Sequence, residues 1–253
     1  MKQLLVIATL TVSLCWFENA AADMVDQFTW STIIPSVAQT DILGTMYREE
    51  LMRQEEQARR GKQEAPSPQG SKPQDQSRVA SLRYIPSKVR REANLSNFIA
   101  KVQAVDPAEA VQLQQLFADG DIIEKIQAAI NSQGLRIDDL ADAYTVWWVA
   151  AWEAAHGGND TPSRVSVNAV KLQSARALAK MQALTTASDQ QKQELAEALL
   201  LHAMLIDGAI DQAKGNAAQL HEVSAAVDKG AAKMGIDMHA IELTEKGFVP
   251  TKR

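Results

Sequence analysis

Cysteine is almost absent from this chain of 253 residues, and the single one, Cys15, lies close to the N-terminus. The fold of the protein must therefore be stabilised by packing and not by disulfide bonds. The same scarcity excludes a thiol nucleophile in the body of the chain, a zinc site built from cysteines and a cysteine-held iron–sulfur cluster.

Motifs that identify common enzyme classes are also missing. The sequence contains no Gly-x-Ser-x-Gly elbow, no Ser-x-x-Lys pair and no glycine-rich phosphate loop. His221-Glu222 begins like the zinc-protease helix, but Ala225 stands where the second histidine ligand belongs. A serine triad assembled from distant residues stays open, because triads are recognised by geometry. We assign no catalytic residue and no metal ligand, and we expect no cofactor.

The charge balance excludes nucleic acid as a partner. Acidic residues outnumber basic ones, 31 to 26, which gives a net charge of −5, and no basic patch is interleaved with aromatics. Hydrophobic residues make up 46% and charged residues 23% of the chain, as in an average soluble globular protein. This composition excludes a collagen-like, a fully disordered and a polytopic membrane protein.

The N-terminus has the pattern of a signal peptide. Lys2 precedes an apolar stretch from Leu4 to Phe17, which is shorter than the roughly 20 residues needed to span a bilayer. Small residues at Ala20–Ala22 then offer a cleavage site, which makes residues 1–22 a signal peptide and Asp23 the mature N-terminus. We therefore expect a periplasmic or secreted bacterial protein without a transmembrane span in its mature chain.

Two other interpretations of this N-terminus are open. Cys15 could accept a lipid, although Leu14 before it is bulky where lipoprotein processing prefers a small residue. Alternatively, the apolar stretch could remain as an uncleaved anchor. Signal-peptide cleavage uses the alanines at 20–22, which the lipoprotein interpretation leaves without a role.

The mature chain divides into three parts by composition. Residues 23–60 contain one amphipathic helix that Thr40 could cap, and residues 61–83 form a disordered linker rich in Pro, Gln, Ser and Lys. Residues 84–253 form a helical domain. Helix-start signals recur in it at Asp106-Pro107, Asp138, Thr161-Pro162 and Ser188-Asp189.

These signals predict an all-α fold, an irregular bundle of six or seven helices joined by short loops. Glycines at 120, 134, 157–158 and 235 close four of the expected helices. Strand patterns are scarce, with one short extended piece expected around residues 241–248. No repeat period is detected, which argues against a solenoid.

Four segments of the chain resemble an uncharacterised family of exported bacterial proteins. The resemblance covers roughly residues 84–253 and rests on Tyr84-Ile85-Pro86-Ser87, Asp142-Ala143-Tyr144-Thr145-Val146-Trp147-Trp148, Ser188-Asp189-Gln190-Gln191-Lys192-Gln193-Glu194 and Leu243-Thr244-Glu245-Lys246-Gly247-Phe248. It implies a helical domain and an envelope or secreted location. It implies no activity, because the family is a domain of unknown function.

One metal site deserves consideration. Glu153 and His156 have the Glu-x-x-His spacing that places both side chains on one helix face, as di-metal helical sites require. Such sites need a second copy of the motif, which the sequence lacks, although Glu194, Glu197 and His202 could complete an irregular one. The plainer interpretation is a surface carboxylate and a histidine that favours the helix C-terminus.

Charged residues are unevenly distributed. Ten acidic residues against two basic ones lie between residues 104 and 160, and a glycosidase carboxylate pair could be among them. Most of these acids fall in first turns, where they cap helices. Residues 62–92 have the opposite balance, with seven basic and three acidic residues, and could contact anionic lipid or polymer or fold back on the acidic part.

An aromatic stripe is the most distinctive feature of the domain. Tyr144, Trp148, Trp152 and His156 recur every four residues along one expected helix, beside Trp147. Such stripes usually lie in a core, and we expect Trp148 to be buried. The alternative is a groove that binds an apolar or glycan ligand, with these four residues as its surface.

We interpret the chain as an exported, non-enzymatic helical protein that binds a protein or glycan of the bacterial envelope. The alternative is a cell-wall hydrolase that uses carboxylates. The two differ in structure, because a hydrolase needs two carboxylates that converge in a cleft, whereas a binding module needs an exposed apolar patch or groove.

Overall fold

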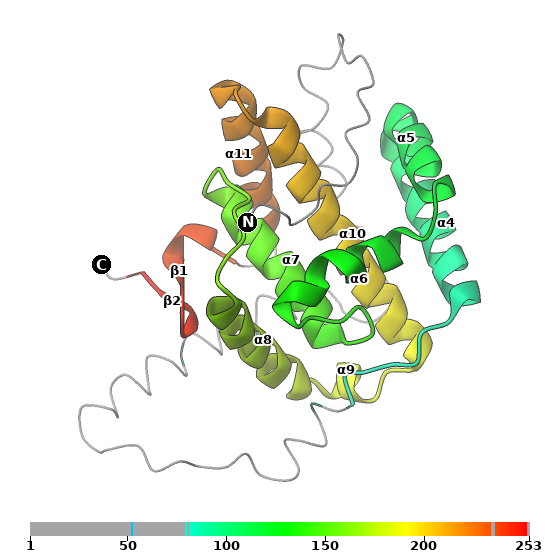
Figure 1. Cartoon of the computed structure of the whole chain (residues 1–253), viewed down its shortest axis with the longest axis horizontal. Coiled ribbons are helices and arrows are strands. Elements are labelled where there is room, and N and C mark those ends of the chain that lie inside the picture. The colour runs from blue at the N-terminus through cyan, green and yellow to red at the C-terminus, as the bar shows by residue number, and fades with distance from the viewer. Residues whose placement is uncertain (1–51, 53–78, 80, 234–235, 252–253) are drawn as a thin grey trace.

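A computed structural model of the chain describes residues 52, 79, 81–233 and 236–251 (Figure 1). The expected signal peptide, the helix expected within residues 23–60 and most of the expected linker at residues 61–83 lie outside this part. The described part contains eight α-helices and one two-stranded sheet, which confirms the all-α fold class. None of its helices combines the length and the apolar character that crossing a membrane requires.

Seven of the described helices are longer than one turn, in agreement with the expected six or seven, and α9 is a single turn. The elements are α4 (Lys88–Val105), α5 (Pro107–Ala118), α6 (Ile122–Ile130), η1 (Asn131–Gln133), α7 (Leu140–Ala155), α8 (Arg164–Ala179), α9 (Gln182–Thr185), α10 (Asp189–Ala213), α11 (Ala217–Lys233), η2 (Met238–Ala240), β1 (Ile241–Thr244) and β2 (Gly247–Pro250).

Side-chain caps explain where most helices begin. The Asp106 carboxylate accepts hydrogen bonds from two first-turn amides of α5, and Asp121 does the same for α6. Ser188 caps α10 in a reciprocal capping box with Gln191. The starts expected at Asp138 and Thr161 are each displaced toward the C-terminus.

The cap of α7 is Asp139 and the cap of α8 is Ser163. Asp138 does not cap α7, and its carbonyl and carboxylate groups have other partners. Its carbonyl accepts from the Tyr84 amide at 3.2 Å, and its carboxylate binds the Arg136 guanidinium. At Ser163 the hydroxyl accepts from the Ser166 amide at 3.1 Å, one turn into the helix.

The long helix α10 runs through the centre of the domain and packs most extensively along α7 (Figure 1). Helix α8 packs on another side of α7, and α11 contacts both α7 and α10. Helices α4 and α5 pack on each other, and α4 and α6 each contact α10. The central position of α7 and α10 explains why both are buried around most of their circumference.

A buried ion cluster joins α4 to α10 and α6. The Arg91 guanidinium donates at 3.0 Å to the Glu197 carboxylate, and both side chains are almost fully buried. Arg91 also pairs with Asp121, the N-cap of α6, and with Glu124 in the first turn of α6. Arg91 belongs to the basic stretch at residues 62–92, which is expected either to contact an anionic lipid or polymer or to fold back on the acidic part of the domain. Arg91 itself folds back, because its partners Asp121 and Glu124 lie in that acidic part.

The N-terminal edge of the domain is packed before Tyr84. Leu82 is fully buried, and its carbonyl accepts a hydrogen bond from the Leu140 amide at 3.2 Å. Arg83 pairs with Asp139 in an isolated bridge. Leu82 and Arg83, which the sequence assigns to the end of the linker, therefore belong to the folded part of the chain.

The extended piece expected around residues 241–248 is a β-hairpin, in which β1 and β2 pair antiparallel. Gln173 of α8 holds this hairpin on the bundle. Its amide group donates to the Phe248 carbonyl and accepts from the Phe248 amide, both at 2.9 Å, as a neighbouring strand would. On α7, the Trp152 indole donates to the Ile241 carbonyl at 3.0 Å.

Gly247→Ala should destabilise the domain by about 2–3 kcal/mol, the cost of a strained backbone conformation together with a steric clash. The φ of Gly247 is +89°, and an added Cβ would lie 2.3 Å from the Gln173 carbonyl oxygen, which its two hydrogen bonds hold in place. Gly208→Ala is the matched control, because a Cβ at this position in α10 meets nothing within 4 Å. Urea denaturation should find the control as stable as wild type or more so, and equal midpoints for the two variants would contradict the prediction.

Candidate functional site

The aromatic stripe of α7 passes from the core to the surface. Tyr144 is 1% and Trp148 is 3% exposed, which confirms the expected burial of Trp148. The Trp148 ring lies 4.5 Å from that of Phe248 and 5.5 Å from that of Tyr144, measured between centroids. The hypothesis that these two residues form an open ligand surface is therefore wrong, because the C-terminal hairpin and the neighbouring helices cover them.

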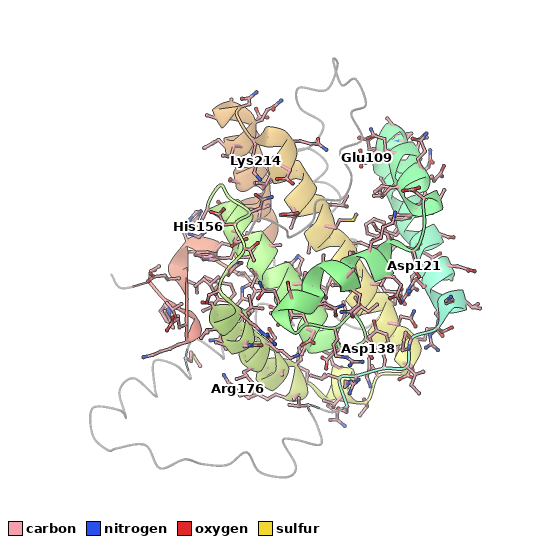
Figure 2. All side chains as sticks on the ribbon, in the orientation of Figure 1. Glu109, Asp121, Asp138, His156, Arg176 and Lys214 are labelled. Carbon is pink, nitrogen blue, oxygen red and sulfur yellow. The ribbon has the colours of Figure 1, made fainter. Side chains whose placement is uncertain are left out.

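The stripe reaches solvent only at its C-terminal end. Trp152 is half-buried, and its ring contacts that of the exposed His156 at a centroid distance of 4.4 Å. The His156 ring lies 4.9 Å from that of His239, which is bound to Asp228 at 2.8 Å. The labelled position of His156 at the end of α7 can be followed in Figure 2. A role in binding stays a prediction for Trp152 and His156.

The residues of the considered metal site do not converge. Glu197 binds Arg91, and His202 accepts a hydrogen bond from the Trp147 indole at 2.9 Å while burial lowers its pKa to about 3. His156 interacts through Nδ1 with the Trp152 carbonyl. Within the described residues, no group of three or more histidine, cysteine or acidic side chains is placed to hold a metal ion.

Most acids of residues 104–160 have structural roles, as expected. Asp106, Asp121 and Asp139 are N-caps, and Asp142 pairs with Lys171 at 2.8 Å in the interface of α7 and α8. Figure 2 places the labelled Glu109, Asp121 and Asp138 apart from one another, on different parts of the fold. Glu153 and Asp160 are different, because both line a pocket.

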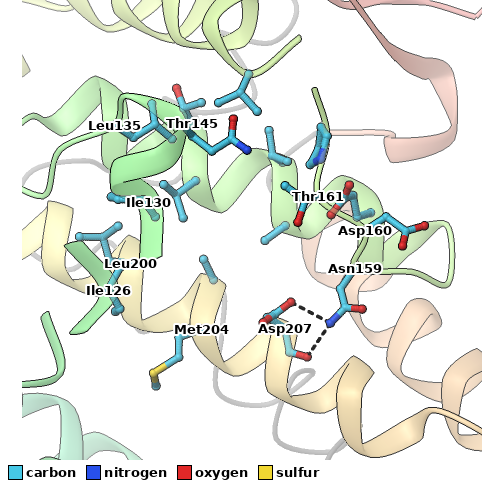
Figure 3. Close-up of a pocket in the computed structure, with 18 residues that line it drawn as sticks. Ile126, Ile130, Leu135, Thr145, Asn159, Asp160, Thr161, Leu200, Met204 and Asp207 are labelled. Atoms are coloured by element: carbon cyan, nitrogen blue, oxygen red, sulfur yellow. Dashed lines mark hydrogen bonds between the residues drawn. The ribbon is translucent and has the colours of Figure 1, made fainter. Parts of the chain in front are cut away.

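This pocket is the candidate site, and it lies between α6, α7 and α10 beside the loop that joins α7 to α8 (Figure 3). Its empty volume is about 740 Å³, which includes open solvent at its mouth. The walls are formed by aliphatic side chains and methionine: Ile126, Ile130, Leu135, Val146, Val149, Ala150, Val167, Leu200, Ala203 and Met204.

Most of the polar lining residues gather at the end formed by the α7–α8 loop and the C-terminal part of α10. The Asn159 side-chain amide donates to the Asp207 carboxylate at 2.8 Å (Figure 3). It also donates to the Asp211 carboxylate at 3.0 Å. Asp160 and Thr161 follow Asn159 in the loop. The positive φ of Gly157, +76°, ends α7 and turns the chain into this loop.

Glu153 lies near the C-terminal end of α7 and lines the same pocket. Burial, which is the largest cause, and the nearby charges of Asp160 and Asp207 together raise its pKa to about 8. Burial also raises the pKa of Asp207, although the hydrogen bond from Asn159 opposes this. At neutral pH the Glu153 carboxyl is therefore mostly protonated and can donate a hydrogen bond.

Two polar groups lie among the apolar walls. The carbonyl oxygen of the Gln133 side chain is buried and has no hydrogen-bond partner among the described residues. Thr145 is different, since its hydroxyl already interacts with the Ala141 carbonyl at 2.8 Å and with Ser174 at 3.0 Å. The Gln133 side-chain oxygen can therefore accept a hydrogen bond from a bound molecule, whereas the Thr145 hydroxyl already has its partners.

The sequence did not indicate this pocket. The sequence places Glu153 in a Glu-x-x-His motif with His156 and, with Asp160, among the ten acids of residues 104–160, but Asn159 and Asp207 match no motif. Only the packing of α7 on α10 brings Glu153 and Asp207 to one end of a cavity.

Comparison with known proteins identifies a family but no activity. A family model described as a family of unknown function, DUF6683, matches residues 1–251, and so extends beyond the resemblance at residues 84–253. No curated protein and no solved structure matches the chain. The chain therefore belongs to DUF6683, a family of unknown function.

Proposed function

We propose that this protein binds a small amphipathic molecule in the pocket between α6, α7 and α10. The observation that carries the proposal is the division of the pocket into long apolar walls and one polar end. Small-molecule sites in proteins have this composition, with a few polar groups that orient an otherwise apolar ligand.

The apolar walls also bear on the two partners that the sequence suggested, a glycan and an envelope protein. A glycan presents hydroxyl groups over most of its surface, and aliphatic walls would leave these without hydrogen bonds. An alkyl or aromatic group has no hydrogen bonds to lose in the same environment, and its transfer out of water is favourable in free energy. We therefore favour an amphipathic small molecule over a glycan, and over an envelope protein, which would need a larger contact surface.

Filling the pocket should abolish binding of a simple apolar probe. In ¹³C-methyl NMR titrations, 1-hexanol should shift the Ile126, Ile130 and Met204 methyl signals saturably, and Ala150→Phe should remove the effect by occupying the cavity. Ala225→Phe is the matched control, since Ala225 is exposed on α11. Unsaturable shifts, or equal binding by the Ala150→Phe variant, would contradict the proposal.

We infer that the protein works outside the cytoplasm. The support is the signal-peptide pattern of Lys2, the apolar stretch at residues 4–17 and the alanines at 20–22. The intact mass of the protein from its native host should correspond to a chain that begins near Asp23. A full-length mass would contradict export with cleavage, and a diacylglyceryl adduct on Cys15 would support a lipoprotein instead.

One observation favours the alternative of a cell-wall hydrolase. Glu153 keeps its proton near neutral pH beside Asp160 and Asp207, and glycosidases use such a pair of a protonated acid and a carboxylate. The apolar walls argue against a glycan in this pocket. The release of reducing sugar from peptidoglycan distinguishes the two functions. A hydrolase should release it as wild type and should lose this activity in the Glu153→Gln variant.

A further inference from the structure

The polar end of the pocket is acidic, and no basic side chain of the described residues lines it. Glu153, Asp160 and Asp207 line it, whereas no lysine, arginine or histidine is among the lining residues in the described part of the chain. Lys214, the residue that follows α10, is bound to Asp211, and its charge also lowers the pKa of Asp207, but it does not line the pocket. The three carboxyl groups therefore share one end of a cavity whose described lining supplies no positive charge, and Glu153 has no basic group among the causes of its pKa shift.

Burial makes this arrangement costly for the protein when it stands alone. A carboxylate that leaves water needs a positive charge or several hydrogen bonds to compensate it. Glu153 responds by keeping its proton, and the pKa of the neighbouring Asp207 is raised as well. A cation bound at this end would supply the missing charge.

The apolar walls determine what kind of cation fits. A hydrated metal ion finds no set of three ligating side chains in the described residues. An organic cation attached to an apolar body would place its charge beside Glu153 and Asp207 and its body between α6, α7 and α10. The buried Gln133 oxygen offers an acceptor for a further donor on the same molecule.

We infer that the pocket selects amphipathic molecules with an ammonium head over neutral and anionic ones of the same shape. This inference rests on the proposed binding function and specifies its ligand class. The acidic end recognises the charge, and the aliphatic walls recognise the body.

Three six-carbon probes test the inference: hexyltrimethylammonium, 1-hexanol and hexanoate. Calorimetric titration of the full mature chain should give the ammonium compound an affinity about tenfold above that of the alcohol, and hexanoate should bind more weakly than both. The quaternary ammonium has no proton to lose. A rise of its affinity between about pH 6 and about pH 9 would therefore report ionisation of the protein, as linkage with Glu153 requires.

Two neutral variants assign the effect to the acidic end. Glu153→Gln should remove the rise with pH and reduce the preference for the ammonium compound, and 1-hexanol should bind it as before. Asp160→Asn alters an exposed loop residue, so it preserves the fold and should lower the same preference. Equal affinity for the alcohol and the ammonium compound would overturn the inference and leave the proposed function standing. Absence of binding for all three probes would overturn both.

Discussion

Trp148→Ala is expected to lower the free energy of unfolding by about 3–5 kcal/mol, the usual cost of emptying a large aromatic site in a core. The Trp148 ring is 3% exposed and packs between Tyr144 of the same helix and Phe248 of the hairpin. Its removal opens a cavity and also withdraws the support of the hairpin on α7. Since the total stability of such a domain is about 5–15 kcal/mol, the variant should melt much earlier or accumulate poorly.

Tyr144→Phe on the same helix is the matched control for this experiment. Its hydroxyl is buried without a hydrogen-bond partner among the described residues, so its removal should leave the stability unchanged or raise it. Trp148→Phe should lie between the two, because most of the ring volume is retained. Thermal and urea denaturation provide the comparison. A Trp148→Ala variant as stable as wild type would contradict the role of this residue in the core.

The helices were predictable from sequence because their signals are local. Asp106 with Pro107, and Ser188 with Gln191, place cap and first-turn residues at fixed spacing, and the structure begins helices at both positions. Local signals fail where a distant segment competes for the same groups. Asp138 has the chemistry of a cap, but its carbonyl is held by the Tyr84 amide and its carboxylate by Arg136, so α7 begins one residue later.

The candidate site could not be predicted in the same way, because its parts come from separate helices and a loop. Glu153 and Asp207 are brought together only when α7 packs on α10, and the sequence does not specify which faces of the two helices meet. The aromatic stripe shows the same limit. Its spacing placed four residues on one helix face, but not the hairpin that covers Trp148 and leaves His156 exposed.

Arg91→Met should cost about 3–5 kcal/mol of stability, because it leaves a buried carboxylate without its positive partner. The Glu197 side chain is 1% exposed and that of Arg91 is 6% exposed, so water cannot replace the lost charge. Asn94 and Gln193 still donate hydrogen bonds to Glu197, but both are neutral. The contact between α4 and α10 should therefore weaken, and urea denaturation should detect the loss.

Arg136→Met is the matched control for this prediction, since Arg136 also binds an aspartate but has a side chain that is 53% exposed. An ion pair in that environment contributes only about 0–1 kcal/mol. The double variant Arg91→Met/Glu197→Gln then separates charge from packing. It removes the stranded carboxylate and should recover much of the stability lost in Arg91→Met, because a buried neutral pair avoids the desolvation cost that a lone charge incurs. A double variant less stable than Arg91→Met alone would mean that Glu197 stabilises the domain through its hydrogen bonds to Asn94 and Gln193 and not through its charge.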